Sequence, residues 1–258
     1  MRGPIAPQAI DSRTHHADNL PQAIDVGPGG SPQRFLAEYR AILTAERVLM
    51  ISPQMRAAIF FDRDGVLTEP VFNPATGEYE SAHDVRDLRL CDDAIDALRR
   101  AQSAGFDLFI VSNQPSYAKG KTTLEAIHQI AQETEARFRA AGVTFREAFY
   151  CYHHPQGIVP EFTGPCRCRK PEPYFLLLAA EKHGIDLSAS WMVGDRGSDI
   201  QCGHRAGCRT IFIDHPHTKP YNDTPSPDHV AQDVAAAVRL IMDDAASRLK
   251  NHHGDSTV

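Results

Sequence analysis

Several features that would assign this chain to a membrane, secreted or nucleic-acid-binding class are missing from its sequence. It has no run of about 18 apolar residues, so it predicts no membrane-spanning helix. Its net charge is −6, which leaves no surplus of cations to neutralise a nucleic-acid backbone. The N-terminal segment lacks the apolar core of a secretory signal. We therefore expect a cytoplasmic monomer that binds neither membranes nor nucleic acid.

Cysteine is scarce, but half of the six cysteines are clustered. In a reducing cytosol they are not expected to form a disulfide framework. The cluster reads C-x-H followed by C-x-C, and three thiolates with one imidazole suit a closed tetrahedral zinc site. With all four positions filled by protein, the role of the metal would be structural. The alternative is a loop of free cysteines. The predicted zinc ligands are Cys151, His153, Cys166 and Cys168.

The composition divides the chain into three parts. Residues 1–55 form an N-terminal extension whose first 31 residues are rich in Pro, Gly, Asn, Asp and Ser and are predicted to be disordered. A helix is expected at 32–49, where apolar residues recur at helical spacing. Residues 56–250 are expected to fold as the functional domain, and 251–258 as a disordered tail.

The domain alternates apolar strands with amphipathic helices. Five strands are expected at 57–61, 106–111, 148–152, 191–193 and 209–213, and residues 70–84 are read as a long loop. Helices are expected at 93–104, 123–141, 174–183, 200–206 and 230–249. Strands separated by helices indicate a parallel sheet with helices on both faces, which is a three-layer Rossmann-like α/β fold. No segment is long enough for a full cap domain.

Carboxylates and a hydroxyl follow the strands, where open parallel sheets gather their ligand chemistry. Asp62 and Asp64 follow the first strand, Ser112 the second and Asp195 the fourth. Each aspartate alone could equally be a turn or helix-capping residue. Three coincident positions, with Lys170 after the cysteine cluster, favour an active site.

The Asp62-Arg63-Asp64-Gly65 spacing suits a reaction that uses two carboxylates on one substrate. Gly65 permits the turn that brings both carboxylates to one substrate. One carboxylate can then attack phosphorus while the other protonates the departing alcohol. Clustered carboxylates also require a cation, and their oxygens suit Mg²⁺.

Four segments resemble, in order, the four motifs of the haloacid dehalogenase superfamily. They are Phe60–Leu67 (FFDRDGVL), Val111–Gln114 (VSNQ), Arg169–Pro171 (RKP) and Val193–Ile200 (VGDRGSDI). The resemblance covers residues 56–215. The cysteine loop and RKP further resemble the branch that contains D-glycero-D-manno-heptose-1,7-bisphosphate 7-phosphatase and histidinol-phosphate phosphatase. In that branch the loop substitutes for a cap.

The resemblance implies a role for each matching residue. Asp62 would be the nucleophile, and Asp64 the general acid and base. Asp62, the backbone carbonyl of Asp64, and Asp195 would hold Mg²⁺, with Asp199 behind them orienting Lys170 or a metal-bound water. The residues expected to hold the phosphoryl group are Ser112, Asn113, Arg169 and Lys170.

The expected function is hydrolysis of a sugar bisphosphate, with heptose 1,7-bisphosphate at its 7-phosphate the leading substrate. Histidinol phosphate is the nearest alternative. A catalytically idle zinc-stabilised scaffold and a nucleic-acid end phosphatase are two further readings. The chain departs from the family at Pro115-Ser116-Tyr117, where Ser-Gly-Ile is common, and in its longer 70–84 segment. Both departures concern the leaving-group side of the site.

Overall fold

The computed structural model describes residues 56–74, 76–214 and 226–253, and for 249–253 the backbone alone. The helix expected at 32–49 and the rest of the N-terminal extension lie outside the described residues. Within the described part, no helix is both long and apolar enough to cross a bilayer.

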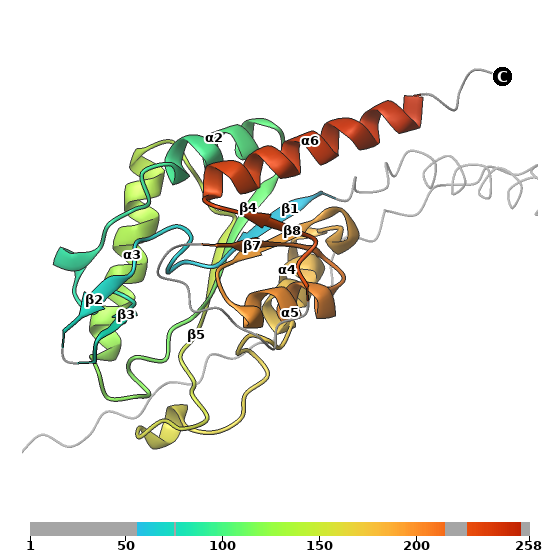
Figure 1. Ribbon diagram of the computed structural model, residues 1–258. Coiled ribbons are helices and arrows are strands. Elements are labelled where there is room, and N and C mark those ends of the chain that lie inside the picture. Colours follow the sequence, from blue (N-terminus) through green and yellow to red (C-terminus); the bar gives the residue numbers. More distant parts are fainter. Residues whose placement is uncertain (1–55, 75, 215–225, 254–258) are drawn as a thin grey trace, which may run out of the picture. The chain divides into compact units, whose positions relative to one another are not determined.

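A six-stranded sheet forms the centre of the domain (Figure 1). Its order is β5-β4-β1-β6-β7-β8, and every neighbouring pair is parallel. In chain order, β4 and β5 follow β1 and lie on one side of it. The next strand, β6, lies on the other side of β1. The strand order therefore reverses at β1, and open α/β sheets bind ligands at such a point. The bounds are β1 Ala58–Phe61, β4 Asp107–Asn113, β5 Glu147–Cys151, β6 Trp191–Gly194, β7 Arg209–Ile213 and β8 His229–Ala231.

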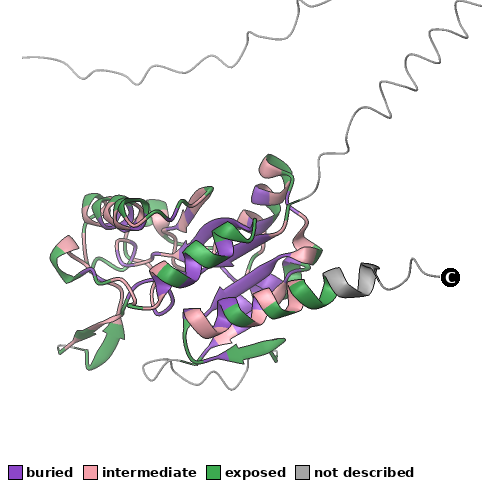
Figure 2. Cartoon of the chain, turned by 90° about the horizontal axis from the view of Figure 1, so that it is seen from above, coloured by how far each residue is buried: buried purple, intermediate pink, exposed green. Residues whose placement is uncertain are grey.

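Helices cover both faces of the sheet, which confirms the three-layer expectation (Figure 1). One core cluster joins the sheet to α2, α3 and α6, and a second joins its other face to α4 and α5. Figure 2 shows the buried strands enclosed between helices whose outer faces are exposed. The helix bounds are α2 Ala94–Ser103, α3 Leu124–Ala140, α4 Tyr174–His183, α5 Gly197–Ala206 and α6 Val234–His253.

The first strand shows why the sheet is central. All four residues of β1 are buried, because helices lie over both of its faces. Ile59 and Phe61 belong to one core cluster, and Ala58 and Phe60 to the other. This alternation follows from the two-residue period of a strand.

Two expectations about secondary structure are wrong. The helix expected at 230–249 begins only at Val234 and runs to His253, beyond the expected domain end at 250, and a sixth strand, β8, precedes it. His229 and Val230 in β8 are exposed, so the strand carries no alternating pattern, and its pairing with β7 defines it. Asp233 then caps the helix by accepting from the N–H of Ala236 at 2.6 Å.

The segment read as a loop at 70–84 contains an antiparallel hairpin. Its strands are β2 Val71–Asn73 and β3 Glu78–Glu80, and a short 3₁₀ turn follows at Val85–Asp87. Gly77 has φ +68°, the left-handed conformation that closes the turn. The exposed rings of Phe72 and Tyr79 pack across the two strands at 5.3 Å. Strands of three residues without a buried side chain leave little periodic signal, which is why the sequence did not predict them.

Candidate active site

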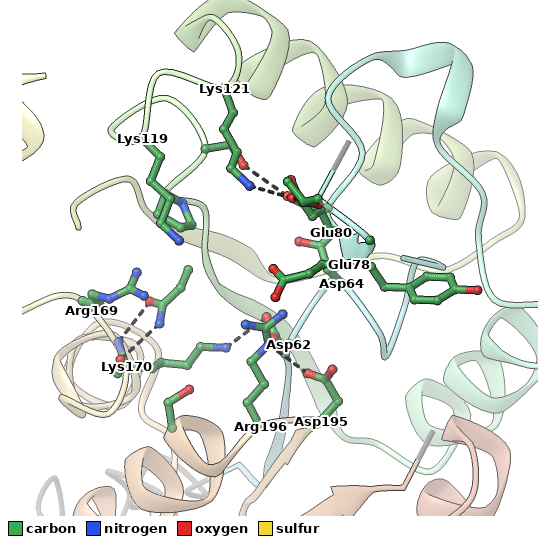
Figure 3. Close-up of a pocket in the computed structure, with 18 residues that line it drawn as sticks. Asp62, Asp64, Glu78, Glu80, Lys119, Lys121, Arg169, Lys170, Asp195 and Arg196 are labelled. Atoms are coloured by element: carbon green, nitrogen blue, oxygen red, sulfur yellow. Dashed lines mark hydrogen bonds and ion pairs between the residues drawn. The ribbon is translucent and has the colours of Figure 1, made fainter. Parts of the chain in front are cut away.

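The carboxyl ends of β1, β4 and β6 meet at one pocket of about 690 Å³ (Figure 3). Asp62 and Asp64 follow β1, Asn113 ends β4, and Asp195 follows β6. The sheet therefore brings together residues that lie more than 130 positions apart in the sequence. The pocket's charged lining residues are Asp62, Asp64, Glu78, Glu80, Lys119, Lys121, Arg169, Lys170, Asp195 and Arg196.

Asp62 is a buried carboxylate that contacts Lys170, Ser112 and the backbone of Arg63. Its Oδ1 lies 3.0 Å from Lys170 Nζ and accepts from the backbone N–H of Arg63 at 2.7 Å. Burial raises the pKa of Asp62, but Lys170, a hydrogen bond from Ser112 and the Arg63 N–H outweigh it, so the pKa lies below its ordinary value. Asp62 is thus held as an anion at the edge of the pocket, the state a nucleophile requires.

Lys170 is the buried cation of the site. Its Nζ contacts Asp199 Oδ1 at 2.6 Å as well as Asp62, and donates to the carbonyl of Val111 at 2.6 Å. Burial lowers the pKa of Lys170, yet Asp199 and Asp62 more than offset it, so the pKa is raised and the side chain stays charged.

Asn113 fixes the backbone that carries this lysine. Its side-chain amide donates to the carbonyl of Lys170 at 3.1 Å, and its Oδ1 accepts from the Lys170 N–H at 3.0 Å. The expectation placed Asn113 on the phosphoryl group, and the structure places its amide on Lys170. Ser112 is 2% exposed and lies beside Asp62.

The carboxylates of Asp62, Asp195 and Asp199 form one group able to hold a metal ion. One oxygen from each lies within 4.8 Å of the others, and Asp195 Oδ1 is buried without a hydrogen-bond partner. Burial, followed by repulsion from Asp62 and Asp199, raises the pKa of Asp195 well above its ordinary value. Three buried carboxylates, one of them with an oxygen that accepts no hydrogen bond, fit a hard cation such as Mg²⁺.

Two glycines make room for these acids. Gly65 has φ +83°, and a Cβ there would lie 2.5 Å from Asp195 Oδ2. A Cβ on Gly194 would lie 2.2 Å from the Cβ of Asp199. Both positions therefore require glycine, one for its conformation and both for space.

Asp64 lines the pocket, and residues behind the pocket wall hold its carboxylate. Arg63 Nε and Nη2 donate to Asp64 Oδ1 at 3.1 and 3.0 Å, and Nη2 also reaches Oδ2 at 3.0 Å. Gln114 Nε2 donates to Oδ2 at 2.6 Å, and Thr68 Oγ1 to Oδ1 at 3.2 Å. No pattern in the sequence predicted a role for Arg63 or Gln114. Their only signal was position, since each is adjacent to a predicted site residue.

The four residues predicted to bind zinc lie together, at the end of β5 and in the loop after it. Cys168 Sγ is 3.3 Å from Cys151 Sγ and 3.5 Å from Cys166 Sγ, and Cys151 and Cys166 are 3.6 Å apart. His153 Nδ1 lies 3.7 Å from Cys168 and 3.9 Å from Cys151. A tetrahedral ion with bonds near 2.3 Å separates its sulfur ligands by about 3.8 Å, so the cluster is close to that arrangement.

This cluster and the pocket are joined by the backbone. Cys168 is followed by Arg169, whose guanidinium donates to the carbonyl of His153 at 3.2 Å, and then by Lys170. On the other side, the carbonyl of Cys151 accepts from the N–H of Gln114 at 2.7 Å. Order in the cysteine loop therefore fixes the chain that delivers two cations to the pocket.

Known proteins share both this fold and much of this sequence. The HAD-hydrolase-like family model matches residues 167–237. A protein of Thermosynechococcus vestitus named D-glycero-D-manno-heptose-1,7-bisphosphate 7-phosphatase is 33% identical over 202 residues, which are 75% of this chain and 99% of that protein. The chain belongs to the HAD-like hydrolases.

Two further similarities are consistent with this assignment. A protein of Escherichia coli K12 named D-glycero-beta-D-manno-heptose-1,7-bisphosphate 7-phosphatase is 36% identical over 156 residues, which are 60% of this HAD-like chain and 78% of that protein. The crystal structure of a D,D-heptose 1,7-bisphosphate phosphatase from B. bronchiseptica, complexed with magnesium and phosphate, superposes with a TM-score of 0.61. It covers 73% of this chain and 99% of its own, at 22% identity, and so shows a shared fold.

Proposed function

We propose that this protein is a Mg²⁺-dependent phosphatase that removes the 7-phosphate of D-glycero-D-manno-heptose 1,7-bisphosphate. The single observation that carries the proposal is the buried Asp62–Lys170 pair at 3.0 Å, which lines a charged pocket. It presents an ionised carboxylate next to a fixed cation, which is what attack on a phosphoryl group needs. The names of the related proteins support the substrate.

The reaction divides into two balanced steps. In the first, an oxygen of Asp62 forms a bond to phosphorus, the ester P–O bond breaks, and Asp64 gives its proton to the departing sugar oxygen. In the second, a water oxygen bonds to the same phosphorus, its proton passes to Asp64, and the Asp62–phosphorus bond breaks to release phosphate. Ser112 and Lys170 would hold the equatorial oxygens throughout, with Asn113 keeping Lys170 in place.

Asp62, Asp195 and the backbone carbonyl of Asp64 would hold Mg²⁺, with Asp199 behind them. Bound there, the ion would supply positive charge to the transferring phosphoryl group. One oxygen of Asp199 forms an ion pair with Lys170, and the other accepts from the Arg196 N–H at 2.9 Å. These contacts suit a role in orienting Lys170. We also propose that Zn²⁺ binds Cys151, His153, Cys166 and Cys168 and has a structural role.

The lysines Lys119 and Lys121 line one wall of the pocket, and they favour a substrate that carries a second anionic group (Figure 3). Partial burial lowers the pKa of Lys119, and repulsion from Lys121, Arg169 and Arg196 lowers it further. Lys121 is paired with Glu80 at 2.6 Å. A second phosphate placed between Lys119 and Arg169 would relieve the repulsion among these cations, as a bisphosphate would do and a monophosphate would not.

The proposal is tested by comparing kcat/KM across substrates in the presence of Mg²⁺. Heptose 1,7-bisphosphate should exceed heptose 7-phosphate and histidinol phosphate by about 100-fold, the worth of two charge-assisted contacts. A Lys119→Met variant should lose most of that preference and keep its rate on the monophosphates. A kcat/KM on histidinol phosphate equal to or above that on the bisphosphate would refute the assigned substrate.

A further inference from the structure

Asp64 is linked to Asp62 by hydrogen bonds that pass through Gln114 and Ser112. Gln114 Nε2 donates to Asp64 Oδ2 at 2.6 Å and lies 3.0 Å from Ser112 Oγ, and Ser112 in turn hydrogen-bonds Asp62. Gln114 is 1% exposed and is absent from the pocket lining. It therefore bridges the two carboxylates of the proposed reaction without facing the substrate.

Arg63 contacts both Asp64 and Gln114. Its guanidinium, 1% exposed, is bidentate on the Asp64 carboxylate, and its Nη2 donates to Gln114 Oε1 at 2.7 Å. Arg63 Nη1 is buried with no hydrogen-bond partner, and the guanidinium carbon lies 5.9 Å from the ring centre of Tyr150. The unmet Nη1 donor costs stability, and the contacts of the guanidinium with the Asp64 carboxylate are what the side chain provides in return.

We propose that Arg63 and Gln114 are positioning residues that aim the Asp64 carboxylate at the oxygen that leaves phosphorus. Arg63 donates to both oxygens of the Asp64 carboxylate, and Gln114 donates to Oδ2. Arg63 and Gln114 are also hydrogen-bonded to each other, so these contacts together restrict the rotation of the carboxylate. An acid displaced by about 1 Å loses much of its rate contribution, since proton transfer depends on hydrogen-bond reach. The inference rests on the proposed function in that the protein cleaves phosphate esters with Asp64 as the acid and base, and it does not depend on the heptose substrate.

The consequence is a rate loss that depends on the leaving group. An alkyl or sugar alkoxide must be protonated as it departs, whereas p-nitrophenolate is a stable anion that leaves without a proton. Misplacing Asp64 should therefore slow cleavage of an alkyl phosphate and spare cleavage of p-nitrophenyl phosphate. Hydrolysis of the aspartyl-phosphate should be slowed for both substrates, because the same carboxylate must then accept a proton from water.

The test compares Gln114→Met with wild type on glycerol 2-phosphate and p-nitrophenyl phosphate with Mg²⁺. We expect kcat/KM to fall about 100-fold on the alkyl ester and less than about 3-fold on the aryl ester, since general acid catalysis contributes about 10²- to 10⁴-fold. The variant should also show a burst of nitrophenolate close to one per site. Asp64→Asn should give the largest ratio of the kcat/KM loss on the alkyl ester to the loss on the aryl ester. Gln129→Met, at an exposed glutamine of α3, is the matched control.

A purely structural role predicts equal losses on both esters and no burst, and that result would overturn the inference. Arg63→Lys keeps the buried cation but cannot hold the carboxylate with two nitrogens, and it should shift the ratio in the same direction. It decides the question if Gln114→Met does not fold. Because glycerol 2-phosphate is a general alkyl phosphate, a wrong heptose assignment leaves this test intact. Wild type inactive on every phosphate ester would instead refute the proposed function.

Discussion

Replacing Lys170 by Met tests how the buried charges of the site are balanced. Lys170 Nζ contacts Asp62 at 3.0 Å and Asp199 at 2.6 Å, and the lysine side chain is 2% exposed. Methionine has a similar length and no charge, so it leaves two buried carboxylates without their cation, next to Asp195. Removing one partner of a buried ion pair costs about 3–5 kcal/mol.

We therefore expect Lys170→Met to lower the free energy of unfolding by about 3–5 kcal/mol in metal-free buffer. Lys182→Met is the matched control, because Lys182 pairs with Glu147 at 2.8 Å but is 54% exposed, and loss of such a pair costs less than about 1 kcal/mol. The activity should fall by about 10²- to 10³-fold, as it does when a transition-state charge contact is removed.

Urea unfolding followed by circular dichroism measures the first effect, and kcat/KM on p-nitrophenyl phosphate the second. Saturating Mg²⁺ should stabilise Lys170→Met by more than it stabilises wild type, since the ion would then supply the missing positive charge. Equal stability losses in Lys170→Met and Lys182→Met would show that Asp62 and Asp199 do not depend on the Lys170 charge. So would a Lys170→Met protein that Mg²⁺ does not stabilise.

Three further predictions follow from the geometry. Gly65→Ala should abolish most Mg²⁺-dependent stabilisation, measured by melting with and without the ion, because its Cβ would lie 2.5 Å from the Asp195 carboxylate. Cys166→Ser should contain less than one equivalent of zinc by metal analysis and melt earlier, and unchanged zinc would disprove the proposed ligand set. Asn113→Ala should lower kcat about 10-fold with little change in stability, because two hydrogen bonds to the Lys170 backbone are lost; wild-type kcat would contradict that role.

The fold was largely predictable because its central strands are buried on both faces. Continuous apolar runs such as Ala58–Phe61 predict buried strands. Gly184 and Gly207 mark the C-terminal ends of two helices. The hairpin at Val71–Glu80 and strand β8 were missed because exposed strands of three residues have no apolar period. Strands of this kind are defined by their pairing.

The candidate site was predictable where residues follow strands directly. Asp62, Ser112 and Asp195 each come at a strand's end, and a parallel sheet places such ends together. The supporting contacts were not predictable. The ties from Gln114 to Asp64 and from Asn113 to Lys170 join segments about 50 residues apart, and they depend on side-chain geometry that no spacing in the sequence encodes.

Borohydride trapping shows whether Asp62 carries the phosphoryl group during the reaction. An aspartyl-phosphate is reduced by borohydride to homoserine, which peptide mass spectrometry can place in the sequence. Asp64→Asn protein mixed with p-nitrophenyl phosphate and Mg²⁺ should accumulate the intermediate, because its hydrolysis needs the missing base. We expect homoserine at position 62 and nowhere else. Continued turnover by Asp62→Asn, or reduction at a different residue, would contradict the account.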